Sequence, residues 1–79
     1  MKLITVDNHS GVPKYKQIIA SIEEAIAVKR LQRGDKLPSV NKVSLEFSIS
    51  RDTVLLAYEE LKKRGIVFSF FIFDRPIVS

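Results

Sequence analysis

The sequence predicts a mainly α-helical fold with a small β element, and three observations support this class. Apolar residues recur at steps of three and four in three separate stretches of the chain. Residues that favour helix ends, such as serine, proline and glycine, flank those stretches. After the last stretch the pattern changes to "VFSFFIF", a run of aromatic and β-branched residues that is typical of strands.

The composition is that of one small globular domain. A chain of 79 residues that is 46% hydrophobic and 28% charged has room for a single core. Because it contains no cysteine, neither disulfide bonds nor a cysteine zinc site can supplement that core. The apolar runs are too short for a signal peptide or a membrane-spanning helix, so we expect a soluble, cytoplasmic protein with no membrane contact. The net charge of +4 modestly favours polyanionic partners.

The first elements are predicted to be a strand and an amphipathic helix. Residues 3–6 alternate in a way that suits a strand, and turn formers follow them. Pro13 suits the first turn of a helix that we expect to end near Arg30. Gly34, in the connection that follows, is free to adopt a positive φ. The apolar face of this helix is predicted to contain Tyr15, Ile18, Ile19, Ile22, Ala25 and Ile26.

A short second helix is predicted after Pro38. Ser39 can cap it by accepting a hydrogen bond from the backbone N–H groups of the first turn. Its apolar positions, which face one way, are Val40, Val43 and Phe47.

A third helix follows after a tight connector made of Ser48 and Ile49. Ser50 is its predicted cap, and Gly65 its C-terminal cap. Two helices joined by so short a turn form a helix-turn-helix, whose second helix can enter the major groove of DNA. The buried stripe of the third helix is predicted to be Val54, Ala57, Tyr58 and Leu61.

The start of the third helix carries the residue types that DNA recognition requires. The Arg51 guanidinium can donate two parallel hydrogen bonds to guanine or clamp a phosphate, and the hydroxyls of Ser50 and Thr53 can bind phosphate oxygens. Asp52 could accept from a cytosine amino group, hold Arg51 in place or complement the helix dipole. The same four residues also make a good ordinary helix start, and periodicity alone does not choose between these interpretations.

Catalytic, metal-binding and cofactor-binding sites are not expected. The sole histidine, His9, lies in a predicted turn without a second ligand or a nucleophile nearby, and there is no glycine-rich phosphate loop. The sequence therefore indicates that the protein is not an enzyme.

Three ordered motifs in residues 11–67 resemble one family, the GntR-type transcriptional regulators. "GVPKYKQIIASIEEAI", "LQRGDKLPSVNKVS" and "FSISRDTVLLAYEELKKRGIV" are similar to the N-terminal winged helix-turn-helix domain of that family. The Ala57–Tyr58 pair looks most like the short YtrA-type repressors. The resemblance implies a three-helix winged helix-turn-helix with an atypical or truncated wing, and DNA contacts from Ser39, Asn41, Ser50, Arg51, Asp52 and Thr53.

The sequence departs from the family pattern at three positions within these motifs. Many members carry arginine where this chain has Asn41 and Leu55, so base contacts at these positions are lost or changed. Ser48 stands where the family usually has glycine, and a positive φ there would cost about 1 kcal/mol.

The tail, residues 68–79, is the largest departure, because it contains no glycine and one cation, Arg75. In a strand, apolar residues would lie on both faces. Three interpretations remain open: a strand that mediates dimerisation, with residues 3–6 as an adjoining strand; a divergent wing that turns at "FDRP"; or a reading frame altered or truncated after Val67. One strand face would present Phe68, Phe70 and Ile72, and the other Ser69, Phe71 and Phe73.

We therefore expect residues 1–79 to form one DNA-binding domain without an effector domain, and no small-molecule effector site within the chain. The implied function is a repressor that binds a pseudo-palindromic operator in double-stranded DNA as a homodimer, through the helix that starts at Ser50. The alternative is a winged-helix module that binds protein through its aromatic tail and no longer reads DNA.

Overall fold

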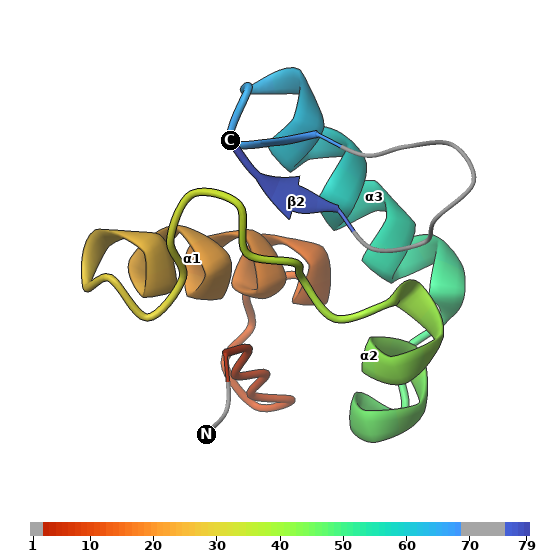
Figure 1. Cartoon of the computed structure of the whole chain (residues 1–79). Helices are drawn as coiled ribbons and strands as arrows, with labels where there is room; N and C mark the ends of the chain where they lie inside the picture. The colour runs from red at the N-terminus through yellow and green to blue at the C-terminus, as the bar shows by residue number, and fades with distance from the viewer. Residues whose placement is uncertain (1–2, 69–75) are drawn as a thin grey trace.

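A computed structural model describes residues 3–68 and 76–79, which form three helices and a two-stranded antiparallel sheet (Figure 1). This is the winged helix-turn-helix arrangement that the sequence predicted. In chain order the elements are α1 (Lys14–Ala27), α2 (Val40–Phe47), α3 (Arg51–Lys63), β1 (Val67–Phe68) and β2 (Ile77–Val78).

The predicted N-terminal strand is wrong, because residues 3–6 do not pair with another strand. Instead, the backbone N–H of Thr5 donates to Ser21 Oγ at 3.1 Å, and Ser21 Oγ donates to the Thr5 carbonyl at 3.2 Å. A side chain of α1 thus satisfies the backbone groups that a neighbouring strand would have bonded. Ile4 is buried at the same time, which fixes this extended segment across α1.

Helix α1 ends at Ala27, three residues before the predicted end. Lys29 has a φ of 63°, and the N–H of Arg30 donates to the Ala25 carbonyl at 2.8 Å. This is the reversal typical of a helix that ends with a left-handed residue, and it turns Leu31 back into the core. The predicted apolar face of α1 is otherwise confirmed, since Ile18, Ile19, Ile22 and Ala25 are buried while Tyr15 and Ile26 pack against its edge.

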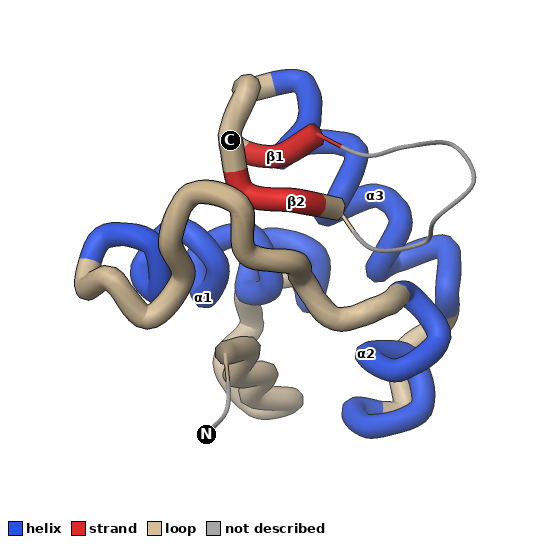
Figure 2. The backbone as a smooth tube through the Cα atoms, viewed as in Figure 1, coloured by secondary structure: helices blue, strands red, loops and turns tan. Residues whose placement is uncertain are grey.

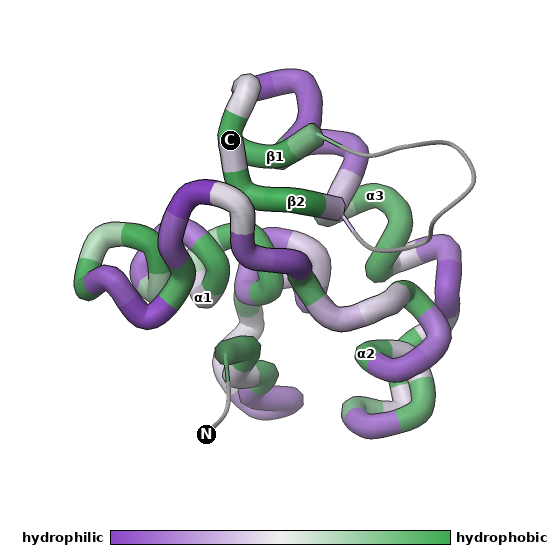
Figure 3. Tube along the Cα trace, in the orientation of Figure 1, coloured by the Kyte–Doolittle hydropathy of each residue, from purple (hydrophilic) through white to green (hydrophobic). Residues whose placement is uncertain are grey.

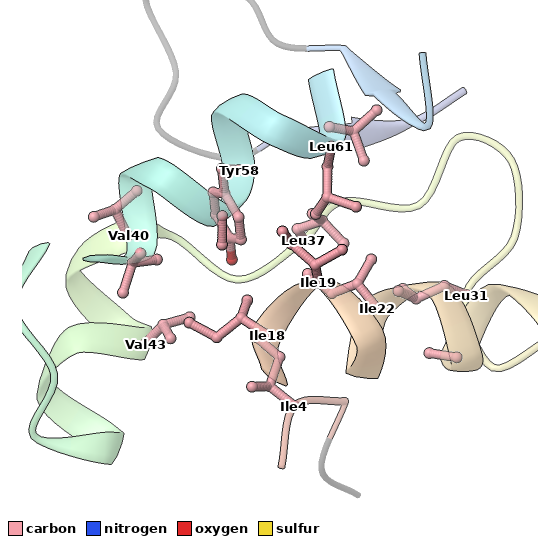
Figure 4. Packing of buried hydrophobic residues seen from close by; sticks show 14 of the residues in the cluster. Ile4, Ile18, Ile19, Ile22, Leu31, Leu37, Val40, Val43, Tyr58 and Leu61 are labelled. Atoms are coloured by element: carbon pink, nitrogen blue, oxygen red, sulfur yellow. The ribbon is translucent and has the colours of Figure 1, made fainter. Parts of the chain in front are cut away.

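The core is built around α3, which packs against α1, α2 and β1. Its predicted stripe is confirmed: Val54, Ala57, Tyr58 and Leu61 are all buried. Figure 4 shows side chains of α1, α2, α3 and the connector between α1 and α2 converging on one interior. Within the described residues no polar or charged side chain is buried, so hydrophobic packing holds the elements together.

The sheet at the C-terminal end pairs Val67 with Val78 and Phe68 with Ile77. The connector between α1 and α2 lies along the other side of β2 (Figure 2). There the Leu37 N–H donates to the Pro76 carbonyl and the Val78 N–H donates to the Asp35 carbonyl, each at 2.8 Å. No pattern in the sequence indicated that this connector would lie beside β2 like a third strand.

An antiparallel return after β1 favours the interpretation of the tail as a divergent wing. Residues 3–6 are in no sheet within the described chain, and the dimer interpretation of the tail stays a hypothesis. The expected two-faced strand and the turn at "FDRP" lie largely outside the described residues. At its described start, Val67 is buried and Phe68 remains 45% exposed.

The turn between α2 and α3 depends on Ser48, which has a φ of 54°. The N–H of Ile49 donates to the Ser44 carbonyl at 3.1 Å, and Ser44 Oγ donates to the Ile49 carbonyl at 2.5 Å. This is the same helix ending that α3 uses, where Gly65 has a φ of 73° and the Ile66 N–H donates to Leu61. At Ser48, the left-handed conformation is occupied by a residue with a Cβ, which strains the backbone.

We predict that Ser48→Gly raises the free energy of unfolding by about 0.5–1 kcal/mol, because glycine removes this strain. Gly65→Ser, the reverse change in the equivalent place, should lower it by a similar amount. Urea titration followed by circular dichroism measures both variants. Ser48→Ala is the control, since alanine has the same Cβ and should not stabilise; a gain with alanine equal to that with glycine would contradict the explanation.

Candidate nucleic-acid interface

Two of the predicted contact residues, Ser50 and Thr53, build the start of α3. Ser50 has extended backbone angles, and its Oγ accepts from the Thr53 N–H at 3.2 Å. The hydroxyls of the two residues are also hydrogen-bonded to each other, at 2.8 Å. Ser50 and Thr53 therefore cap the helix, as the ordinary interpretation of "SRDT" predicted, and since one hydroxyl donates to the other, one O–H of the pair remains free to donate.

Between them, Arg51 and Asp52 extend outward from the first turn. Both are exposed, and within the described residues neither side chain makes a hydrogen bond or an ion pair. Asp52 thus does not hold Arg51 in place; its position in the first turn fits a favourable interaction with the helix dipole. Since the first N–H groups of a helix have no intrahelical acceptor, this turn presents a free guanidinium beside unpaired backbone donors.

The first turn of α2 repeats this arrangement in a shorter helix. The Ser39 Oγ accepts from the Lys42 N–H at 3.1 Å, which confirms the predicted cap. Asn41 and Lys42 are exposed, and their side chains have no hydrogen bond or ion pair among residues 3–68 and 76–79. Lys42 was missed in the sequence, although a lysine in the first turn of a helix beside a candidate DNA contact is a signal that could have found it.

One partly buried hydrogen bond links the middle of α3 to the start of α2. Tyr58 Oη donates to the Pro38 carbonyl at 2.7 Å, from a side chain that is 5% exposed. Pro38 immediately precedes the α2 cap, so α3 holds the chain at the point where α2 begins. Figure 4 shows the Tyr58 ring lying among the core side chains of α1 and α2. The sequence placed Tyr58 in the apolar stripe and did not foresee that its hydroxyl would set the position of Ser39 and Asn41.

Arg64, at the C-terminal end of α3, makes ion pairs within the domain. Arg64 lies 3.3 Å from Glu23 of α1 and 3.5 Å from Glu60 of α3, measured between the charged groups. These ion pairs are about half exposed, so each contributes little to stability. They nevertheless orient this end of α3 toward α1. In the described part of the chain, the arginine of α3 without an ion pair is therefore Arg51, at the opposite end of the helix.

Other kinds of site have little basis in the described residues. No three histidine, aspartate or glutamate side chains in residues 3–68 and 76–79 come together in a way that could hold a metal ion. In the same part of the chain, no helix is both long and apolar enough to cross a membrane.

Comparison with known proteins identifies the family. Residues 14–70 match the family model described as bacterial regulatory proteins, gntR family. The chain belongs to the GntR family. It is thus a helix-turn-helix domain of DNA-binding transcriptional regulators, which assigns it to transcription rather than to catalysis.

One of the similar curated proteins, YtrA, agrees with the subfamily that the Ala57–Tyr58 pair indicated. The chain is 38% identical over 56 residues to the uncharacterized regulator YcxD and 37% identical over 65 residues to the transcriptional repressor YtrA, both of Bacillus subtilis. These matches cover 71% and 82% of the chain, but 13% of YcxD and 50% of YtrA. The chain thus spans half or less of the length of these relatives.

The fold is also similar to that of YtrA from Sulfolobus acidocaldarius, a GntR-family transcription factor. The TM-score is 0.87 at 36% sequence identity, over 96% of this chain and 64% of that one. The GntR family and the YtrA-like character of the domain are therefore confirmed.

We predict that Tyr58→Phe lowers the free energy of unfolding by about 1 kcal/mol, because the Pro38 carbonyl loses its side-chain donor while the packing volume is kept. Amide exchange should accelerate at the start of α2 more than in α1. Native-state hydrogen exchange measures both effects. Uniform acceleration across α1 and α2 would show that the hydroxyl contributes only global stability, and Tyr15→Phe, a tyrosine at the edge of the core, is the matched control.

Proposed function

We propose that this domain is a sequence-specific repressor that binds a pseudo-palindromic operator as a homodimer, with α3 in the major groove. The observation that carries the proposal is the first turn of α3, where Arg51 is exposed beside free backbone donors and has no hydrogen-bond or ion-pair partner among the residues that the structure describes. Arginine is the residue best suited to a bidentate contact with guanine, and the N-terminal residues of a recognition helix are those that contact base edges.

The remaining predicted residues take positioning roles in this proposal. Ser39 and Asn41 at the start of α2, with Lys42 beside them, bind phosphates and set the register of the domain on the duplex. The hydroxyls of Ser50 and Thr53 keep capping α3 and also reach the DNA backbone beside the same groove. Asp52 either accepts from a cytosine amino group or only stabilises the helix start.

The domain is small enough for a dimeric arrangement on DNA. Its principal extents are 32 × 28 × 23 Å, so two copies fit on half-sites roughly 34 Å apart, one helical turn of DNA. The spacing of the two α3 helices in such a dimer is part of the proposal. Repression is carried over from YtrA of Bacillus subtilis, whose name describes a transcriptional repressor.

We predict that Arg51→Ala abolishes specific binding, at a cost of about 1–3 kcal/mol in binding free energy if Arg51 reads a base. The operator is first selected from a random duplex pool at about 150 mM salt, and the best sequence is then titrated against a scrambled duplex at several salt concentrations. Arg33→Ala is the charge-matched control, since Arg33 is an exposed arginine in the connector outside the helix-turn-helix. It should weaken both duplexes alike.

Equal affinity of wild type and Arg51→Ala for the selected duplex would refute the assignment of Arg51. Weak binding that ignores sequence and disappears with salt would refute the proposal as a whole and favour the protein-binding alternative. An inverted repeat in the selected sequences, together with a dimeric complex on it, is the result that the proposal requires.

A further inference from the structure

Two adjacent leucines of α3 are exposed and take no part in the core. Leu55 and Leu56 are 42% and 52% exposed, whereas the neighbouring Val54 and Ala57 are fully buried. In Figure 3 the tube of α3 turns from hydrophilic to hydrophobic after its first residues, because the exposed and the buried positions of this stretch are both apolar. Within residues 3–68 and 76–79, packing accounts for leucine at neither of the two exposed positions.

An isolated exposed leucine is common on protein surfaces, so the location of this pair decides its meaning. Residues four apart lie side by side on a helix. Leu55 is therefore the neighbour of Arg51, one turn further along the same exposed strip. The strip begins at the free guanidinium and continues as an apolar surface before the next charged residue on it, Glu59.

The two leucines lie on different sides of α3. Leu56 is followed four residues later by Glu60, whose carboxylate reaches Arg64, and Arg64 in turn contacts Glu23 of α1. That side of the helix thus turns toward α1. Leu55 lies on the side that leads back to Arg51, the residue proposed to read a base.

We infer that Leu55 determines specificity by contacting the C5-methyl group of a thymine. This inference rests on the proposed DNA-binding function. Among the base-edge groups of the major groove, only this methyl is apolar; the others donate or accept hydrogen bonds. A leucine beside cytosine or guanine would desolvate a polar group without a partner. Leu55 therefore selects a T·A pair next to the base pair that Arg51 contacts.

The inference is tested with DNA that differs from the selected operator by single methyl groups. Replacing one thymine by uracil removes the C5-methyl and leaves base pairing and the O4 acceptor unchanged. We expect uracil at one thymine of each half-site to weaken binding of the full chain roughly three- to tenfold. With Leu55→Ala, affinity should be the same for the thymine and uracil duplexes.

Matched variants separate this contact from general packing. Leu56→Ala removes the more exposed leucine at the neighbouring position and should keep the full thymine-to-uracil difference. Leu55→Met, which remains apolar, should keep most of it. Thermal melting checks that each variant is folded, and the uracil scan with the wild-type protein does not depend on any variant.

The outcomes distinguish this inference from the proposed function. If selection yields no specific site, both fail. If a specific site is found and Arg51→Ala abolishes its binding, but no thymine shows a methyl effect that Leu55→Ala removes, the thymine contact alone is refuted. A methyl effect that Leu56→Ala removes and Leu55→Ala retains would equally overturn the assignment to Leu55.

Discussion

The burial of one stripe of α3 is the constraint on which the rest of the structure depends. Val54, Ala57, Tyr58 and Leu61 are each 5% exposed or less, and the helix that carries them packs against α1, α2 and β1. A domain of this size has no second core to correct a misplaced element. The stripe therefore fixes the rotation of α3 about its own axis, and that rotation decides which side chains remain on its outer face.

Helix endings set the path of the chain between these packed elements. Each helix is followed by a left-handed residue, namely Lys29, Ser48 and Gly65, and by a buried or half-buried apolar residue that returns to the core. Only the last of these endings uses glycine, the residue that adopts this conformation without strain. The short α2–α3 turn is thus specified by hydrogen bonds around Ser44 and by burial of Ile49 rather than by backbone preference.

The candidate interface combines rigid and free groups within a single turn. Ser50 and Thr53 are fixed by their mutual hydrogen bond, while Arg51 between them has no partner within the described part of the chain. A fixed helix start loses little order on binding, since its backbone and its two capping hydroxyls are already held in place. Through Tyr58 and Pro38, the same core also positions the start of α2.

Local sequence signals by themselves determined the three helices, the two serine caps and the buried stripe of α3. These features depend on residues within one or two turns of each other: a hydroxyl and the N–H three residues later, or apolar side chains three and four apart. The ordered motifs likewise indicated the family. Whether Ser39, Asn41, Ser50, Arg51, Asp52 and Thr53 touch DNA stays a prediction.

Tertiary structure decided the features that depend on residues far apart in the chain. Residues 3–6 have the alternation of a strand, but Ser21 in α1 supplies their hydrogen-bonding partner. The connector of residues 34–37 has no strand signal and still bonds to β2, because the tail returns beside it. The Tyr58 hydroxyl donates to the Pro38 carbonyl, which lies 20 residues away in the chain. Such pairings depend on which surfaces meet in the folded chain, and periodicity within one element carries no information about them.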